Sequence, residues 1–71
     1  MWDREIVIGQ QFRKRGFLHH IWQVVAVTEV AHAPRHAVLM RMDDRTETKT
    51  ISCPTLADPH YYERVAPQAQ D

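Results

Sequence analysis

The sequence predicts a mainly all-β domain: a small antiparallel barrel or strongly bent sheet of about five strands, with a helical turn near residues 53–60. Apolar residues recur at the two-residue spacing of strands, β-branched residues dominate the longest apolar segment, and turn-forming residues separate the segments. A chain of 71 residues has room for one hydrophobic core. We therefore expect residues 1–71 to form a single domain, ordered over about residues 5–65, with a frayed tail at residues 66–71.

The first two expected strands cover residues 6–12 and 21–30. Because side chains alternate between the two faces of a strand, Ile6, Ile8 and Phe12 are expected on one face together with Gln10. A basic turn at residues 13–16 follows. The second strand is dense in β-branched residues, and its apolar side chains fall on both faces. This strand is therefore expected to be central in the sheet or bent.

Two further strands are expected after Pro34, which cannot donate a hydrogen bond to a strand ladder. Residues 36–42 form the third strand and residues 46–52 a half-exposed fourth strand. The natural pairing of the two is a hairpin whose tip is residues 43–45.

A helical turn is expected over residues 53–59, where two cap-and-proline patterns occur. Ser52 stands ahead of Pro54, and Asp58 directly precedes Pro59. The next segment, residues 61–65, is either a short closing strand or the end of that helix, and we favour the strand. The predicted core consists of Ile8, Phe12, Trp22, Val24, Leu39, Ile51 and Leu56.

The order of four long strands, a helical turn and a short strand resembles that of small SH3-like β-barrels. The residues that carry the resemblance are Gly9 before Phe12, Trp22-Gln23-Val24, Leu39, Thr50-Ile51-Ser52 and Leu56. The pattern is also similar to short uncharacterised bacterial proteins, which supply no function to carry over. The resemblance covers residues 6–65 and implies the fold without the ligand, because one fold hosts many functions. The acidic, aromatic-rich loop with which signalling SH3 domains hold proline-rich peptides is absent from the sequence, as is a clear aromatic cage for methylated lysine.

Composition indicates a soluble cytoplasmic protein that does not enter membranes. The single cysteine cannot close an intramolecular disulfide, which fits a reducing compartment. Acidic residues stand where a signal peptide needs a basic region. No apolar run reaches the length of about 18 residues that a membrane-spanning helix requires.

Basic residues are concentrated in one part of a chain that is neutral overall. Nine basic side chains balance nine acidic ones, but residues 13–41 carry five basic residues against one acidic residue. Phe17 and Trp22 lie among these cations, a combination that suits phosphate contacts and base stacking. Solvated turns and core aromatic residues are the alternative explanation. The sequence thus predicts a binding face for an anionic partner made of Arg13, Lys14, Arg15, Arg35 and Arg41.

Aromatic residues near both ends of the chain form a second candidate surface. Trp2, Tyr61 and Tyr62 suit a protein interface or a homodimer contact, because each ring has an apolar body and a polar tip. The alternative is that one tyrosine is buried and the other exposed.

The residues that could carry catalysis or bind metal are five histidines and Cys53. Adjacent His19 and His20 point to opposite faces of a strand, and no paired spacing indicates a closed zinc site, so metal binding is a distant alternative. Cys53 beside Pro54 is explained as a small buried residue rather than a nucleophile. We expect no catalytic residue, no cofactor and no small-molecule substrate.

These observations favour a non-enzymatic binding module that recognises a partner protein or associates with itself. Binding of RNA or DNA through the basic and aromatic residues is the alternative. The identity of the partner and the oligomeric state do not follow from the sequence.

Overall fold

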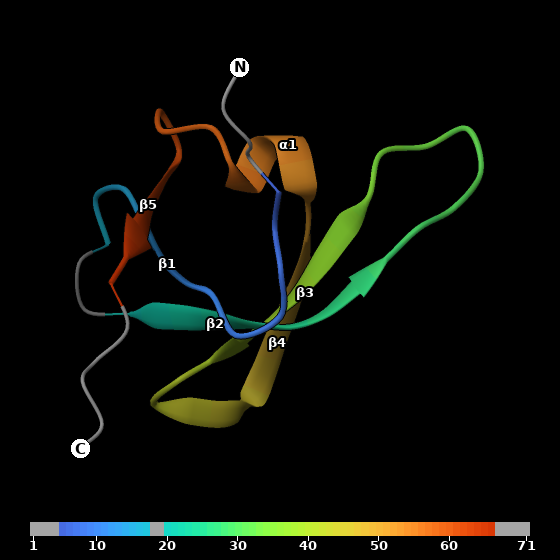
Figure 1. The fold of residues 1–71 in the computed structure, drawn as a ribbon. Coiled ribbons are helices and arrows are strands. Elements are labelled where there is room, and N and C mark those ends of the chain that lie inside the picture. The colour runs from blue at the N-terminus through green and yellow to red at the C-terminus, as the bar shows by residue number, and fades with distance from the viewer. Residues whose placement is uncertain (1–4, 18–19, 67–71) are drawn as a thin grey trace.

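The computed structural model describes residues 5–17 and 20–66 of the chain. This part forms five strands and one short helix in the order β1 (Gln11–Lys14), β2 (Ile21–Thr28), β3 (His36–Arg41), β4 (Asp44–Ser52), α1 (Cys53–Leu56) and β5 (Tyr62–Val65). The strands make one antiparallel sheet with the order β4-β3-β2-β1-β5 (Figure 1). The predicted mainly β fold class is confirmed.

The sheet is open rather than closed into a barrel. Among the described residues β4 and β5 each pair with one neighbour and form the two edges. Figure 1 shows β3 with β4 and β1 with β5 on two sides of the molecule, with α1 beside the N-terminal segment. The apolar face of the sheet is therefore covered by short segments and not by a second sheet.

The N-terminal segment departs from the predicted strand over residues 6–12. Residues 7–10 form a turn closed by a backbone hydrogen bond of 3.3 Å, in which Gly9 has a φ of 100°. The turn interrupts the alternation of side chains, so that Ile6 is 1 % exposed and Ile8 is 65 % exposed. The prediction of Ile8 in the core is wrong, and Ile6 occupies the core instead.

Strand β2 is both central and bent, so both alternatives for this segment hold. Its pairing with β3 shifts register between Val24 and Ala26, which marks a β-bulge. Before the bulge Trp22 and Val24 face the core, and after it Val27 packs against the core. Val25 lies at the bulge and is exposed.

Strands β3 and β4 form the predicted hairpin with a shorter tip. Arg41 pairs with Asp44, so the tip is residues 42–43 rather than residues 43–45. Strand β4 consequently begins two residues earlier than the expected range of residues 46–52. Most of its residues are exposed, as predicted for a half-exposed strand.

The predicted helical turn and closing strand are both present. The Ser52 hydroxyl caps α1 by accepting a hydrogen bond from the Thr55 N–H at 3.4 Å, and Pro54 lies in the first turn. The Tyr62 N–H donates to the Asp58 carbonyl at 3.1 Å and leads the chain into β5. The segment over residues 61–65 is thus a strand from Tyr62 onward. The described residues contain no helix long and apolar enough to cross a membrane.

The hydrophobic core lies on one face of the sheet, under the N-terminal segment and α1. Five of the seven predicted core residues are buried, and Ile51 packs against the core from a partly buried position. The buried apolar residues of the described chain are Ile6, Phe12, Trp22, Val24, Ala37, Leu39, Cys53, Leu56 and Tyr62.

The turn at residues 7–10 predicts opposite responses of two neighbouring isoleucines. Ile6→Val removes a methyl group from the core and is expected to lower the free energy of unfolding by about 0.5–1.5 kcal/mol. Ile8→Val changes an exposed side chain and should leave the free energy of unfolding within about 0.5 kcal/mol of the parent value. Urea unfolding followed by circular dichroism measures both. Equal losses in the two variants, or a larger loss for Ile8→Val, would contradict the turn.

Candidate functional site

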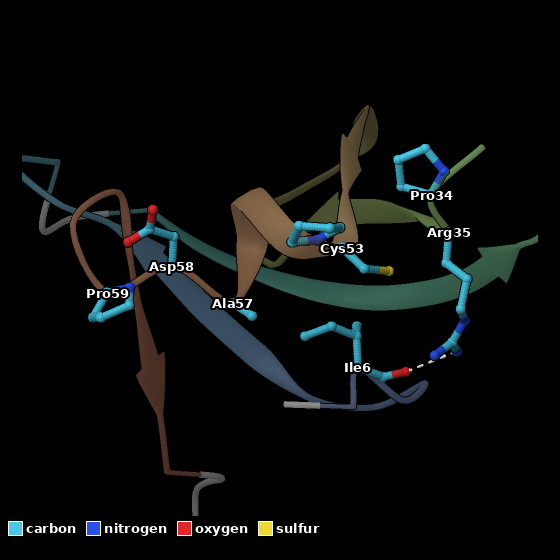
Figure 2. A pocket seen from close by; sticks show the side chains of 8 residues that line it. Ile6, Pro34, Arg35, Cys53, Ala57, Asp58 and Pro59 are labelled. Atoms are coloured by element: carbon cyan, nitrogen blue, oxygen red, sulfur yellow. Dashed lines mark hydrogen bonds between the residues drawn. The ribbon is translucent and has the colours of Figure 1, made fainter. Parts of the chain in front are cut away.

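A hollow of about 600 Å³ lies between α1, the residues ahead of β3 and the N-terminal segment. Its walls are mainly apolar, and Figure 2 shows Arg35 and Asp58 on opposite sides of it. The exposed residues Pro34, Pro54 and Pro59 belong to its lining, so the hollow opens to solvent. Its volume lies within the range of about 300–1,000 Å³ that is typical of ligand sites. Ile6, Cys53 and Ala57 complete the lining.

Arg35 connects the three segments that form the hollow. Its backbone carbonyl accepts a hydrogen bond from the Cys53 N–H at 2.8 Å, which ties the start of α1 to the residue ahead of β3. Its guanidinium Nη2 donates to the Ile6 carbonyl at 3.2 Å, as Figure 2 shows. One residue therefore holds the N-terminal segment, β3 and the helix around a common space.

Arg35 and Asp58, the two charged residues that line the hollow, each contact a neighbouring polar side chain. The Arg35 Nε lies 3.3 Å from the Glu29 carboxylate. The Asp58 carboxylate accepts a hydrogen bond from the His60 N–H at 2.9 Å and lies 3.1 Å from His60 Nδ1. Both side chains are only about two-thirds covered, with relative exposures of 34 % for Arg35 and 38 % for Asp58. The hollow thus has a positive side and a negative side that solvent still reaches.

Cys53 is buried, as predicted, and its sulfur points toward the space beside Arg35 and Ile6 (Figure 2). Burial raises the pKa of the Cys53 thiol, and the positive charge of Arg35 opposes this effect only in part. The thiol therefore stays protonated at neutral pH and is a poor nucleophile, because the thiolate is the reactive form. It contributes an apolar wall to the hollow.

Four of the five basic residues predicted to form one positive face lie in ion pairs within the fold. Arg13 and Arg15 approach the two carboxylate oxygens of Glu63 on β5, at 3.5 and 3.7 Å. The Arg15 Nε also donates to the Pro59 carbonyl at 2.6 Å. These contacts join the end of β1 to β5 and to the loop before it.

Arg41 is the most strongly paired of these basic residues. It donates to the Asp43 carboxylate and to the Glu47 carboxylate, at 2.6 and 2.7 Å. The hydrogen bond from Arg41 lowers the pKa of Asp43. Arg35 precedes β3 and Arg41 ends it, so a strand of six residues, about 20 Å, separates them. Lys14 is the one member of the predicted face for which the described residues provide no carboxylate within ion-pair distance.

The candidate interface aromatics have different environments. Tyr62 is buried in the core, whereas Tyr61 is 55 % exposed. This is the arrangement of one buried and one exposed tyrosine that we considered as an alternative. Trp2 lies outside the described residues.

The histidines are distributed over loops and strand ends. His60 contacts Asp58, and His36 Nδ1 lies 2.9 Å from the Pro34 carbonyl. In the described ranges no group of three or more His, Cys, Asp or Glu side chains is placed to hold a metal ion. His19 lies outside these ranges.

The hollow itself was not found from the sequence, because its lining comes from three separate segments of the chain. Its signal in the sequence is the set of three prolines, whose local pattern predicts only turns and a loop. The sequence predicts Ile6 in a regular strand and Arg35 in a face for an anionic partner. Their joint role depends on a contact between residues 29 positions apart.

The raised pKa of Cys53 predicts slow alkylation of the native protein. At pH 8 iodoacetamide should modify the folded chain much more slowly than the urea-unfolded chain, because burial disfavours the thiolate. Stability linked to this group is present below the unfolded pKa and is lost as the pH rises through the higher folded pKa. Mass spectrometry of quenched time points measures the rate. Equal rates in the folded and unfolded chains would contradict the buried position.

The chain matches no protein-family model, and searches of curated proteins and of solved structures return no match. The chemistry of the site therefore provides the basis for a functional proposal.

Proposed function

We propose that this chain is a non-enzymatic binding module of SH3-like topology that holds an extended segment of a partner protein in the hollow beside α1. The topology is supported by the position of β1 between β2 and β5 and by the helical turn ahead of the last strand. The observation that carries the function is the apolar hollow between a cationic and an anionic side chain.

The lining favours a peptide as the ligand. Exposed proline rings provide rigid apolar surface that loses little conformational entropy when a ligand covers it. A peptide can place one apolar side chain between the prolines and offer an acidic group to Arg35 and a basic group to Asp58. Opposite charges on the two sides of the hollow would then fix the direction of the bound segment.

The chemistry of the hollow favours binding over turnover. Its one thiol has a raised pKa, which is the reverse of what an activated nucleophile needs. The Asp58 carboxylate accepts a hydrogen bond from the His60 N–H in a local turn, and no activated nucleophile lies beside it among the lining residues. Both features support a site that recognises a ligand without transforming it.

The proposal is tested with a library of random linear peptides displayed on phage. Peptides enriched on the parent protein are synthesised, and their dissociation constants are measured by fluorescence anisotropy. Pro54→Glu places a charge inside the hollow at an exposed position in the first turn of α1, where an acidic residue is favourable for the helix. We expect this change to weaken binding by about tenfold or more, which corresponds to about 1.4 kcal/mol.

Thr48→Glu is the matched control, because it adds the same charge at an exposed position of β4 that does not line the hollow. This variant should bind within about twofold of the parent. Bound peptide should also slow alkylation of Cys53 by iodoacetamide. Enrichment of no peptide, or equal binding by the parent and Pro54→Glu, would overturn the proposal. Growth in size with concentration that Pro54→Glu abolishes would identify a second copy of the chain as the occupant.

A further inference from the structure

Two exposed aromatic rings lie beside the turn that follows β1. Phe17 and Tyr61 are each 55 % exposed, and they are the exposed aromatic side chains of the described residues. The Phe17 N–H donates to the Lys14 carbonyl, and the Arg15 N–H donates to the Tyr61 carbonyl, each at 2.9 Å. The backbone thus places Phe17 beside Lys14 and Tyr61 beside the next residue, Arg15.

Two lysines lie among the rings at this end of the sheet. Lys14 Nζ is 5.2 Å from the centre of the Phe17 ring, and Lys14 is the cross-strand partner of Tyr62. Lys49 Nζ donates to the Tyr62 hydroxyl at 3.4 Å and lies 4.1 Å above the Trp22 ring. Cation–π contact and the packed stem keep the Lys49 ammonium in place. Tyr62 therefore lies between the two lysines.

Neither lysine is within ion-pair distance of a carboxylate of the described residues. Glu47 acts on Lys49 electrostatically, but its carboxylate accepts a 2.7 Å hydrogen bond from Arg41. Burial, and to a smaller degree the positive charge of Lys14, lowers the pKa of Lys49. This end of the molecule therefore carries two ammonium groups that repel each other and that no carboxylate of the described residues pairs.

We infer that Lys14, Phe17, Lys49 and Tyr61 form a cation–aromatic surface that binds single-stranded nucleic acid. The two ammonium groups would contact successive phosphates, and the exposed rings would stack on unpaired bases. A single strand fits better than a duplex, because bases in a duplex do not expose their faces. An acidic protein would use the ammonium groups but would gain little from the rings. This surface is separate from the hollow, since none of its four residues lines the hollow.

The test is the binding of fluorescein-labelled decathymidylate at several salt concentrations, measured by anisotropy. For a single strand the logarithm of affinity falls with the logarithm of salt by about 0.7 per phosphate contact, so two contacts give a slope near −1.4. A double variant, Lys14→Gln with Lys49→Met, should remove most of this slope. The methionine keeps an apolar stem over Trp22. Phe17→Ala should weaken binding by about tenfold and leave the slope unchanged, because stacking on a ring releases no counterions.

Arg45→Gln is the matched control, because it removes one positive charge from an exposed residue of β4 outside the surface. This variant and Pro54→Glu should bind the oligonucleotide as the parent does. Circular dichroism establishes that each variant retains the β-sheet. The inference is overturned if the parent does not bind at low salt, if Arg45→Gln loses as much affinity as the lysine variant, or if polyglutamate competes equally well and Phe17→Ala has no effect. The last outcome would indicate an acidic protein as the partner.

Discussion

A single open sheet has one apolar face that must be shielded from water, and this chain has few residues with which to shield it. The face of the sheet that carries Val24 and Leu39 is covered by Ile6 from the N-terminal segment and by Leu56 from a helix of four residues. Burial of these side chains provides the hydrophobic free energy on which the fold depends. Because the cover consists of separate pieces, the space between them remains as the hollow. The candidate site is thus a direct consequence of the way in which the core is closed.

Arg35 connects the two segments that cover the core, α1 and the N-terminal segment. A short helix and a turn have little stability of their own, because each fixes many backbone angles for few hydrogen bonds. The backbone of Arg35 binds the first residue of α1, and its side chain binds the carbonyl of Ile6. A planar guanidinium with several donors suits such a connection better than a lysine ammonium. The same group presents positive charge to the hollow, so structural and binding roles coincide at one residue.

Three arginines and the two lysines have different roles in this fold. The arginines at positions 13, 15 and 41 hold carboxylates and connect neighbouring strands. Lys14 and Lys49 instead lie against aromatic rings, where a flexible stem covers apolar surface and the ammonium stays at its edge. Among the described residues, Lys14 and Lys49 therefore keep positive charge that no carboxylate pairs, whereas these three arginines do not. A count of basic residues along the chain does not reveal this distinction, since it depends on where the acidic residues lie in space.

The sequence by itself determined the local structure of this protein. The β-branched segment that became β2, the hairpin of β3 and β4, the Ser52 cap with Pro54 and the burial of Cys53 all follow from preferences that act within a few residues. The tertiary structure decided the rest. The turn at Gly9 places Ile6 rather than Ile8 in the core. The bulge in β2 turns Val27 rather than Ala26 toward the core.

The candidate sites also depend on tertiary structure. The lining of the hollow, the partners of the arginines and the position of Lys49 above Trp22 join residues that are far apart in the chain. Such contacts are fixed by strand register and by the packing of one core. A side-chain pattern shows which residues prefer burial, but it contains no information on which distant residue each of them will meet.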